Sequence, residues 1–337
     1  MRGLKSVVVG HPGGRNTVVP VRKLQPCGQM RVLLVHNPKS GDDNHGRDQL
    51  IELITRAGHD VTYHKAKRSW QSALDSEPDL VVAAGGDGTV SEVVRAIGGR
   101  NMLVTALPLG TANNIAGWLG IVDVPVDQLV RKWDDGDVQP FDVGVADGPW
   151  GRRTFLESVG VGLLTDTMAE IDSGVAGYVN RLDGRDARVD AALAVLEQRL
   201  DDPPVVACRM QLDDQDVSGD YLLVEIMNFG TAGPNLRLSP NAHADDGLLD
   251  IVTIAATQTS SLKAHLSSLR SGPGHLPFVG VTRAQRVTID CEGCQFHLDD
   301  ELWPDGRGTA HVRGHLETRH AAVKFLVPRP MSRRLQS

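Results

Sequence analysis

Residues 79–92 read DLVVAAGGDGTVSE, and this stretch decides the fold. The apolar run at residues 79–83 has the length and composition of a buried parallel strand. After the glycines, apolar residues recur at the spacing of one helical face: Val90, Val93, Val94 and Ile97. The stretch therefore predicts a strand, a glycine turn and a helix whose unpaired N–H groups point at whatever ligand occupies the turn.

The glycine turn at residues 85–88 suits an anionic ligand. Three glycines in four positions let a ligand approach the backbone closely and permit positive φ angles. Phosphate is a common guest at such a helix start. The turn fits neither common nucleotide signature, because Ser91 replaces the third glycine of G-x-G-x-x-G and no Gly-Lys pair follows. Taken alone, it also fits a tight strand-to-helix turn without a ligand.

Two neighbouring apolar runs end in similar polar loops. Residues 32–41 read VLLVHNPKSG, and residues 103–114 read LVTALPLGTANN. In an open parallel sheet the carboxyl ends of the strands meet at one edge, where ligands bind. The sequence therefore predicts that three loops together surround a phosphate-bearing ligand.

The order of the elements predicts the fold class. Apolar runs and helical stripes alternate over residues 30–135, which indicates a doubly wound parallel sheet with helices on both faces. After the polar break WDDGD at 133–137, strand-like runs such as 153–159 predict a mainly antiparallel β domain over 136–310, with a helix at 188–200. Residues 1–29 and 329–337 are basic without any acid, and we expect a flexible extension and tail.

Composition excludes several classes of function. The formal net charge is −7, the isoelectric point is about 5.9 and aromatic residues make up 4%, so neither a nucleic-acid surface nor a base-stacking platform is expected. No apolar run reaches the roughly 18–20 residues of a membrane span. Four cysteines are compatible with free thiols in a reducing compartment, and we expect a cytoplasmic protein.

The three loops resemble the nucleotide loops of the diacylglycerol kinase family. The matching segments are Asn37–Gly41 (NPKSG), Gly85–Thr89 (GGDGT) and Pro108–Asn113 (PLGTAN). That family includes bacterial lipid kinases and sphingosine kinases and is distantly similar to the NAD kinases, which share the Gly-Gly-Asp-Gly-Thr element. The resemblance implies a second domain that is a β-sandwich holding a lipid. It also implies that the chain returns to the first domain at about residues 311–328.

The resemblance further implies that the loops hold ATP together with Mg²⁺. Backbone N–H groups of the glycine turn and the Thr111 hydroxyl would cradle the phosphates, while Asp87 would meet Mg²⁺ or the ribose. The predicted nucleotide-binding residues are Asn37, Ser40, Gly41, Gly85, Gly86, Asp87, Gly88, Thr89, Gly110, Thr111 and Asn113.

The segment Leu298–Glu301 resembles the family's Asp-Gly-Glu motif. By this resemblance Asp299 is the general base and Glu301 the second acid. Asp300 replaces the glycine, so this residue must avoid or endure a positive φ. Its charge should also raise the pKa of Asp299.

A metal site is implied by a second similar segment. Residues 238–250, LSPNAHADDGLLD, resemble the stretch with which some bacterial members bind a structural Mg²⁺. The best match is Asp246 with the carbonyl of Leu248, whereas His243 is a poor ligand because Mg²⁺ prefers oxygen. A plain Asp-Gly turn is the alternative.

We therefore expect an ATP-dependent kinase that phosphorylates a lipid hydroxyl at a membrane surface. The alternatives are an NAD-kinase-like enzyme acting on a soluble nucleotide, and a nucleotide-binding protein without turnover. The loops at 37–41 and 110–113 and the late acidic pair favour the lipid kinase. Asp300 in place of glycine leaves the last alternative open.

Overall fold

The computed structural model describes residues 28–40, 45–174, 176–269, 280–304 and 310–329. It also contains two short strands that pair with each other, β1 (Val7–Val9) and β2 (Thr17–Val19). Most of the predicted extension at 1–29, nearly all of the predicted tail at 329–337, and Gly41 lie outside the described residues.

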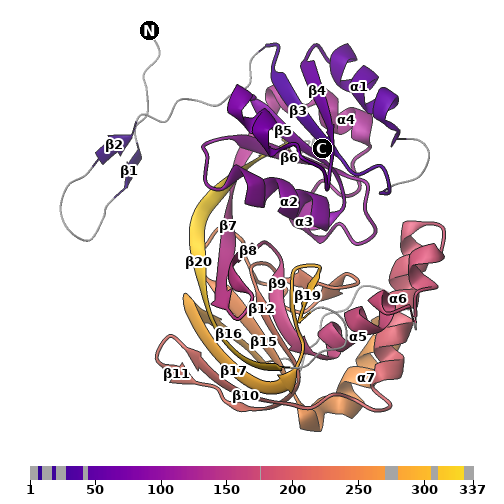
Figure 1. Cartoon of the computed structure of the whole chain (residues 1–337), viewed down its shortest axis with the longest axis vertical. Coiled ribbons are helices and arrows are strands. Elements are labelled where there is room, and N and C mark those ends of the chain that lie inside the picture. Colours follow the sequence, from indigo (N-terminus) through magenta and orange to yellow (C-terminus); the bar gives the residue numbers. More distant parts are fainter. Residues whose placement is uncertain are drawn as a thin grey trace, which may run out of the picture.

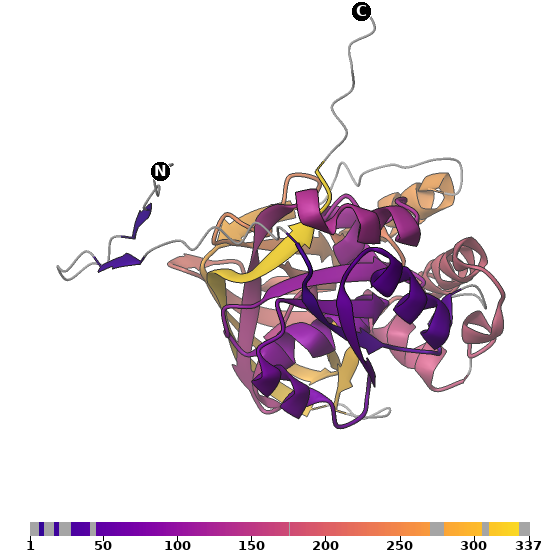
Figure 2. The same ribbon diagram turned by 90° about the horizontal axis from the view of Figure 1, so that it is seen from above.

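The N-terminal part is a parallel-sheet domain (Figure 1). Its strands run in the order β4-β3-β5-β6, with bounds β3 (Arg31–His36), β4 (Asp60–Lys65), β5 (Leu80–Gly85) and β6 (Leu103–Pro108). All of β5 is buried, as expected for a strand covered on both faces. The helices are α1 (Arg47–Arg56), α2 (Asp87–Ile97), α3 (Asn114–Trp118) and α4 (Val126–Arg131). Figure 2 looks down on this domain and shows helices on both sides of the strands.

The C-terminal part is an antiparallel β-rich domain. Its main ladder runs β19-β18-β9-β12-β10-β17-β20, and β15 and β16 extend it beside β12. The strands are β7 (Asp137–Gly148), β8 (Gly151–Phe155), β9 (Ser158–Gly162), β10 (Val206–Leu212), β11 (Gln215–Asp216), β12 (Gly219–Met227), β13 (Thr231–Ala232), β14 (Leu236–Arg237), β15 (Leu249–Ala255), β16 (Gly280–Ala284), β17 (Arg286–Cys294), β18 (Phe296–Leu298) and β19 (Glu301–Trp303). Three helices lie together along one side of it: α5 (Leu163–Asp172), α6 (Arg185–Arg199) and α7 (Thr259–Leu269) (Figure 1).

One long strand, β20 (Ala310–Val327), joins the two domains. Its first half pairs with β17 in the β-rich domain, and near its end Lys324 and Phe325 pair in parallel with β6. The ladder with β7 is irregular between Arg319 and Val323, where the buried carboxylate of Asp142 accepts the N–H of Ala321 at 2.6 Å. The sheet is therefore continuous, and β20 curves as it passes from one domain to the other (Figure 1).

The observed architecture confirms the predicted fold class, with local differences. The strand expected at 153–159 is two strands, because the N–H groups of Leu156 and Glu157 leave the ladder to bond the Asp299 carboxylate. Helices α5 and α7 were not predicted. Within the described residues, no helix has both the length and the apolar character needed to cross a membrane.

Candidate active site

The glycine turn and the third loop touch each other through their backbones. A Cβ on Gly110 would lie 2.3 Å from the Cα of Gly86, so only glycine fits at this approach. The Asn113 side chain holds the third loop closed, accepting the N–H of Gly110 at 2.9 Å and donating to its carbonyl at 2.8 Å. The two loops thus form one wall beside the start of α2.

The first loop lies next to them because β3 is the neighbour of β5. The N–H of Asn37 donates to the carbonyl of Ala84 at 2.9 Å, and its side-chain amide donates to the Ser40 hydroxyl at 2.8 Å. The structure therefore brings Asn37 and Ser40 to the same sheet edge as the glycine turn.

The Asp87 side chain lies at the start of α3. Its carboxylate accepts the N–H groups of Asn114 and Ile115 at 3.0 and 2.9 Å, so it caps α3. Partial burial raises the pKa of Asp87, although these hydrogen bonds act against the rise. A carboxylate engaged in this way positions the third loop against the glycine turn, and it also lines the cavity beside Gly88.

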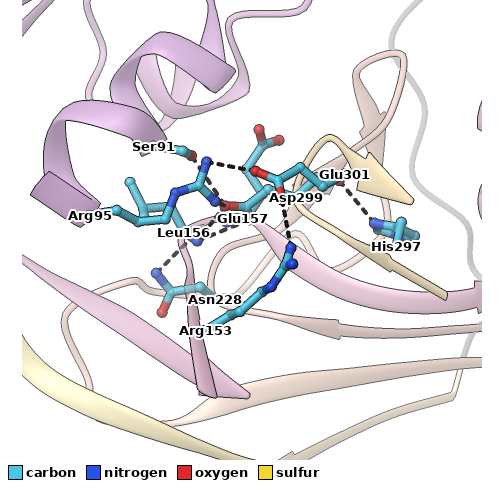
Figure 3. Close-up of polar contacts among 9 residues, drawn as sticks. All are labelled: Ser91, Arg95, Arg153, Leu156, Glu157, Asn228, His297, Asp299 and Glu301. Atoms are coloured by element: carbon cyan, nitrogen blue, oxygen red, sulfur yellow. Dashed lines mark hydrogen bonds and ion pairs between the residues drawn. The ribbon is translucent and has the colours of Figure 1, made fainter. Parts of the chain in front are cut away.

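The Asp299 carboxylate lies at the contact between the domains (Figure 3). Oδ1 accepts the N–H groups of Leu156 and Glu157 at 2.9 and 2.8 Å, and the Leu156 N–H also reaches Oδ2 at 3.1 Å. Oδ2 accepts the Ser91 hydroxyl at 3.2 Å and lies 3.6 Å from the Arg95 guanidinium, both on α2. The side chain is 1% exposed. Burial raises the pKa of Asp299 to about 6. The hydrogen bond from the Glu157 N–H and the charge of Arg95 act against this rise, and the charge of Asp300 adds to it.

Asp300 avoids the strained conformation that its position seemed to require. The positive φ falls one residue earlier, on Asp299, at 51°. The exposed Asp300 carboxylate lies over the glycine turn, where a Cβ on Gly88 would be 2.4 Å from its Oδ2. The acidic turn of the β-rich domain and the glycine turn of the parallel-sheet domain therefore face each other.

Glu301 holds two arginines rather than projecting freely. Its carboxylate lies 3.4 Å from Arg95 of α2 and 2.7 Å from Arg153 of β8 (Figure 3). Since these arginines belong to different domains, Glu301 links the two sides of the site.

A cavity of about 280 Å³ lies between the two turns. Asp87, Gly88, Thr111, Glu157 and Asp300 contribute to its wall. Burial, followed by the charges of neighbouring carboxylates, raises the pKa of Glu157 well above its ordinary value. Burial therefore favours the protonated forms of Asp87 and Glu157 in this cavity.

Two arginines of α6 reach this region although no motif marked them. Arg188 donates to the Thr111 hydroxyl at 3.3 Å, and Arg185 donates to the Ala112 carbonyl at 3.0 Å. Guanidinium groups are well suited to phosphate oxygens. Ser91 and Arg95 were missed as well, although their spacing of four residues places them on one face of α2.

The predicted metal site contains an ion pair. The Arg283 guanidinium lies 3.7 Å from the Asp246 carboxylate and 3.4 Å from that of Asp250. The Leu248 N–H donates to Asp246 at 3.0 Å. Across the described ranges, no cluster of three or more His, Cys, Asp or Glu side chains could hold a metal ion. Because Arg283 already supplies the positive charge, Asp246 and Leu248 do not fit a resident Mg²⁺.

Comparison with known proteins gives two family matches that together span most of the chain. Residues 31–146 match the model described as diacylglycerol kinase catalytic domain. Residues 167–321 match the model described as YegS C-terminal NAD kinase beta sandwich-like domain.

Individual relatives and a solved structure agree with these matches. A diacylglycerol kinase of Bacillus subtilis is 24% identical over 286 residues, covering 80% of this chain and 89% of the relative. A Stenotrophomonas maltophilia protein named "Probable lipid kinase YegS-like" is 29% identical, covering 77% and 88%. The crystal structure of a Bacillus anthracis diacylglycerol kinase superposes with a TM-score of 0.63 at 19% identity, covering 89% of this chain and 97% of that one, and shares the fold.

Proposed function

We propose that this chain transfers the γ-phosphoryl group of ATP to a lipid hydroxyl. The premise is that the chain belongs to the diacylglycerol kinase catalytic-domain family and is a kinase. Relatives named diacylglycerol kinase and lipid kinase support a lipid as the acceptor. The meeting of the acidic turn at 299–301 with the glycine turn supports the reaction most directly. It brings a carboxylate beside the helix start that we propose binds phosphate.

The donor is the Mg²⁺ complex of ATP, held by the three loops. Backbone N–H groups of Gly86, Gly88 and Thr89 are the proposed phosphate donors, and Arg188 adds a positive charge beside Thr111. Asn37, Ser40 and Asn113 shape the same edge. Mg²⁺ enters with the phosphates as part of the substrate, and neutralises charge as the terminal group is transferred.

The acceptor hydroxyl is proposed to lose its proton to Asp299. The O–H bond breaks, the oxygen forms a bond to the γ-phosphorus, and the bond from that phosphorus to the β-phosphate oxygen breaks to release ADP. With a pKa of about 6, Asp299 is ionised at neutral pH and able to accept the proton.

Access to Asp299 requires an exchange of donors. Oδ2 already accepts the Ser91 hydroxyl, and the side chain is 1% exposed. A small change in the angle between the domains would move Ser91 away and let the acceptor hydroxyl take its place on the same oxygen. The carboxylate keeps the two backbone donors on Oδ1 throughout.

The test is incubation with ATP labelled in its γ-phosphate, with either a mixed lipid extract or NAD as acceptor. Labelled lipid is the expected product. Labelled NADP would overturn the lipid assignment, and ATP binding without any labelled product from either acceptor would overturn the kinase.

The role of Asp299 is tested by Asp299→Asn. We expect ATP binding to persist and kcat to fall by about 10²–10⁴-fold, the usual loss for a general base. The matched control is Asp290→Asn, which removes a carboxylate of the same domain that pairs with the exposed His311. Full activity of Asp299→Asn would refute the assignment.

A further inference from the structure

A buried histidine–glutamate pair lies directly behind the acidic turn at 299–301. The side chains of His297 on β18 and Glu225 on β12 are 4% and 0% exposed. Nε2 of His297 lies 2.9 and 3.1 Å from the two carboxylate oxygens of Glu225. Nδ1 lies 3.0 Å from the backbone carbonyl oxygen of Asp299 (Figure 3). The histidine therefore bridges the interior of the β-rich domain to the backbone of the proposed base.

Both ring nitrogens of His297 face groups that only accept hydrogen bonds. The Asp299 carbonyl has no proton to give, so Nδ1 must carry one; with Glu225 as a carboxylate, Nε2 carries the second and the ring is an imidazolium. Burial alone would lower the pKa of His297, but the charge and hydrogen bond of Glu225 and the Asp299 carbonyl outweigh it and raise the pKa.

The neighbouring strand leaves room for this pair. A Cβ on Gly160 of β9 would lie 2.2 Å from Oε1 of Glu225 and 2.5 Å from Nε2 of His297. Any larger residue at position 160 would displace the carboxylate or the ring. The pair is thus accommodated by the backbone of a third strand.

The contact matters because Asp299 has an unusual backbone. Its φ of 51° lies in the left-handed region, which is strained for a non-glycine residue and persists only when the surroundings enforce it. The Asp299 N–H donates to the carbonyl of Ser158 at 2.8 Å, and its own carbonyl accepts from His297. These two contacts hold the backbone on either side of the strained angle.

We infer that His297, as an imidazolium paired with Glu225, is a positioning residue that fixes the backbone of Asp299 and so aims its carboxylate at the acceptor. The inference rests on the proposed kinase function. His297 does not exchange a proton with the substrate; it acts through Asp299. Loss of the ring proton would free the Asp299 carbonyl and let the turn relax.

The surroundings of the ring favour its charged form. Glu225 faces it from β12, and Asp299 and Asp300 from its own turn. Glu157, ahead of β9, and Asp87 of α2 line the same cavity, in which His297 is the one basic side chain among the lining residues. Activity should therefore be present below the raised pKa of His297 and be lost as the pH rises through it.

The test is Glu225→Gln. Glutamine keeps the size and an acceptor for Nε2–H but removes the charge that holds the proton on the ring. We expect the alkaline limb of kcat to move to lower pH by roughly 1–3 units, while KM for ATP stays unchanged. Asp290→Asn is the control, since it removes the carboxylate of an exposed His–Asp pair and should leave the limb in place. An active Glu225→Gln enzyme with an unmoved alkaline limb would overturn the inference.

A spectroscopic measurement separates this inference from the proposed function. The ¹⁵N signals of His297, assigned by their absence in His297→Asn, should show two protonated nitrogens at neutral pH and a titration point above the ordinary value for histidine. This readout needs neither ATP nor lipid, and it does not depend on whether Glu225→Gln folds. A neutral His297 at pH 6 would refute the positioning role, whereas an imidazolium in a protein that phosphorylates no lipid would refute only the kinase proposal.

Discussion

The hydroxyl of Ser91 in α2 donates a hydrogen bond of 3.2 Å to Oδ2 of Asp299, a residue 208 positions later in the chain. One turn further along α2, Arg95 lies 3.6 Å from the same oxygen. The contact between the domains and the proposed catalytic centre are therefore the same place. Any change in how the domains meet will alter the surroundings of this carboxylate.

The first prediction concerns Arg95→Met. Arg95 lowers the pKa of Asp299 from the value that burial would give, so its removal should raise that pKa above about 6. Because the ionised carboxylate is the active form, activity rises with pH through this value. The acidic limb of kcat/KM should move up by about 1 unit. Arg100→Met, which breaks an exposed pair with Asp75, is the control and should leave the limb unmoved.

The second prediction concerns Asp300→Asn. The charge of Asp300 raises the pKa of Asp299, so its removal should shift the acidic limb of kcat/KM to lower pH by up to about 1 unit. Maximal kcat should stay within about threefold of the parent protein. A loss of 10²-fold or more, measured under saturating ATP, would instead mean that Asp300 itself acts on the substrate.

Local sequence patterns predicted the parallel-sheet domain well because they reflect local physics. Three features depend only on neighbours within a few residues: the strand that ends at Gly85, the glycine turn and the apolar face of α2. All three form as predicted. Even so, the hydrogen bonds of the Asp87 side chain could not be predicted, since its partners lie 27 and 28 positions later at the start of α3.

The surroundings of Asp299 could not be predicted for the same reason. The acidic motif pointed to the turn, but which donors surround its carboxylate depends on how two domains pack. The pairing of His297 with Glu225 spans 72 positions and joins strands whose order in the sheet no local pattern specifies. The role of the α6 arginines likewise depends on the third loop, which they contact only in the folded protein.

The third prediction concerns Arg188→Met. Loss of this guanidinium beside Thr111 removes one charged contact from the proposed phosphate site. A hydrogen bond to a charged group contributes about 1.5–3 kcal/mol, so KM for ATP should rise by roughly 10–100-fold. Arg199→Met on the same helix removes a pair with Asp166 instead and should leave KM unchanged. Steady-state kinetics at a fixed lipid concentration provide the measurement. An equal rise in KM for ATP in both variants would contradict the assignment.

The fourth prediction compares two glycines. In Gly110→Ala the new methyl group would lie 2.3 Å from the Gly86 backbone and 2.7 Å from Asn113 Oδ1, so the third loop must move. We expect a destabilisation of about 1–3 kcal/mol and at least a tenfold weaker binding of ATP, measured by calorimetry. Gly117→Ala places its methyl group in open space on α3 and should be neutral or stabilising by about 0.5–1 kcal/mol.

The last prediction concerns Glu157→Gln and stability. Burial raises the pKa of Glu157 in the folded protein well above that in the unfolded chain. As the pH rises above the unfolded value, the unfolded chain releases its proton first, so the folded state loses stability with increasing pH. Glutamine keeps an acceptor for the Asn114 side-chain amide, which donates to Glu157 at 2.9 Å. The variant should therefore be more stable than the parent at pH 8 by at least about 1 kcal/mol, the cost of one pKa unit. The gain should shrink toward pH 4.5. Thermal unfolding of both proteins across this range provides the measurement, and a difference that does not vary with pH would show that Glu157 is not the titrating group.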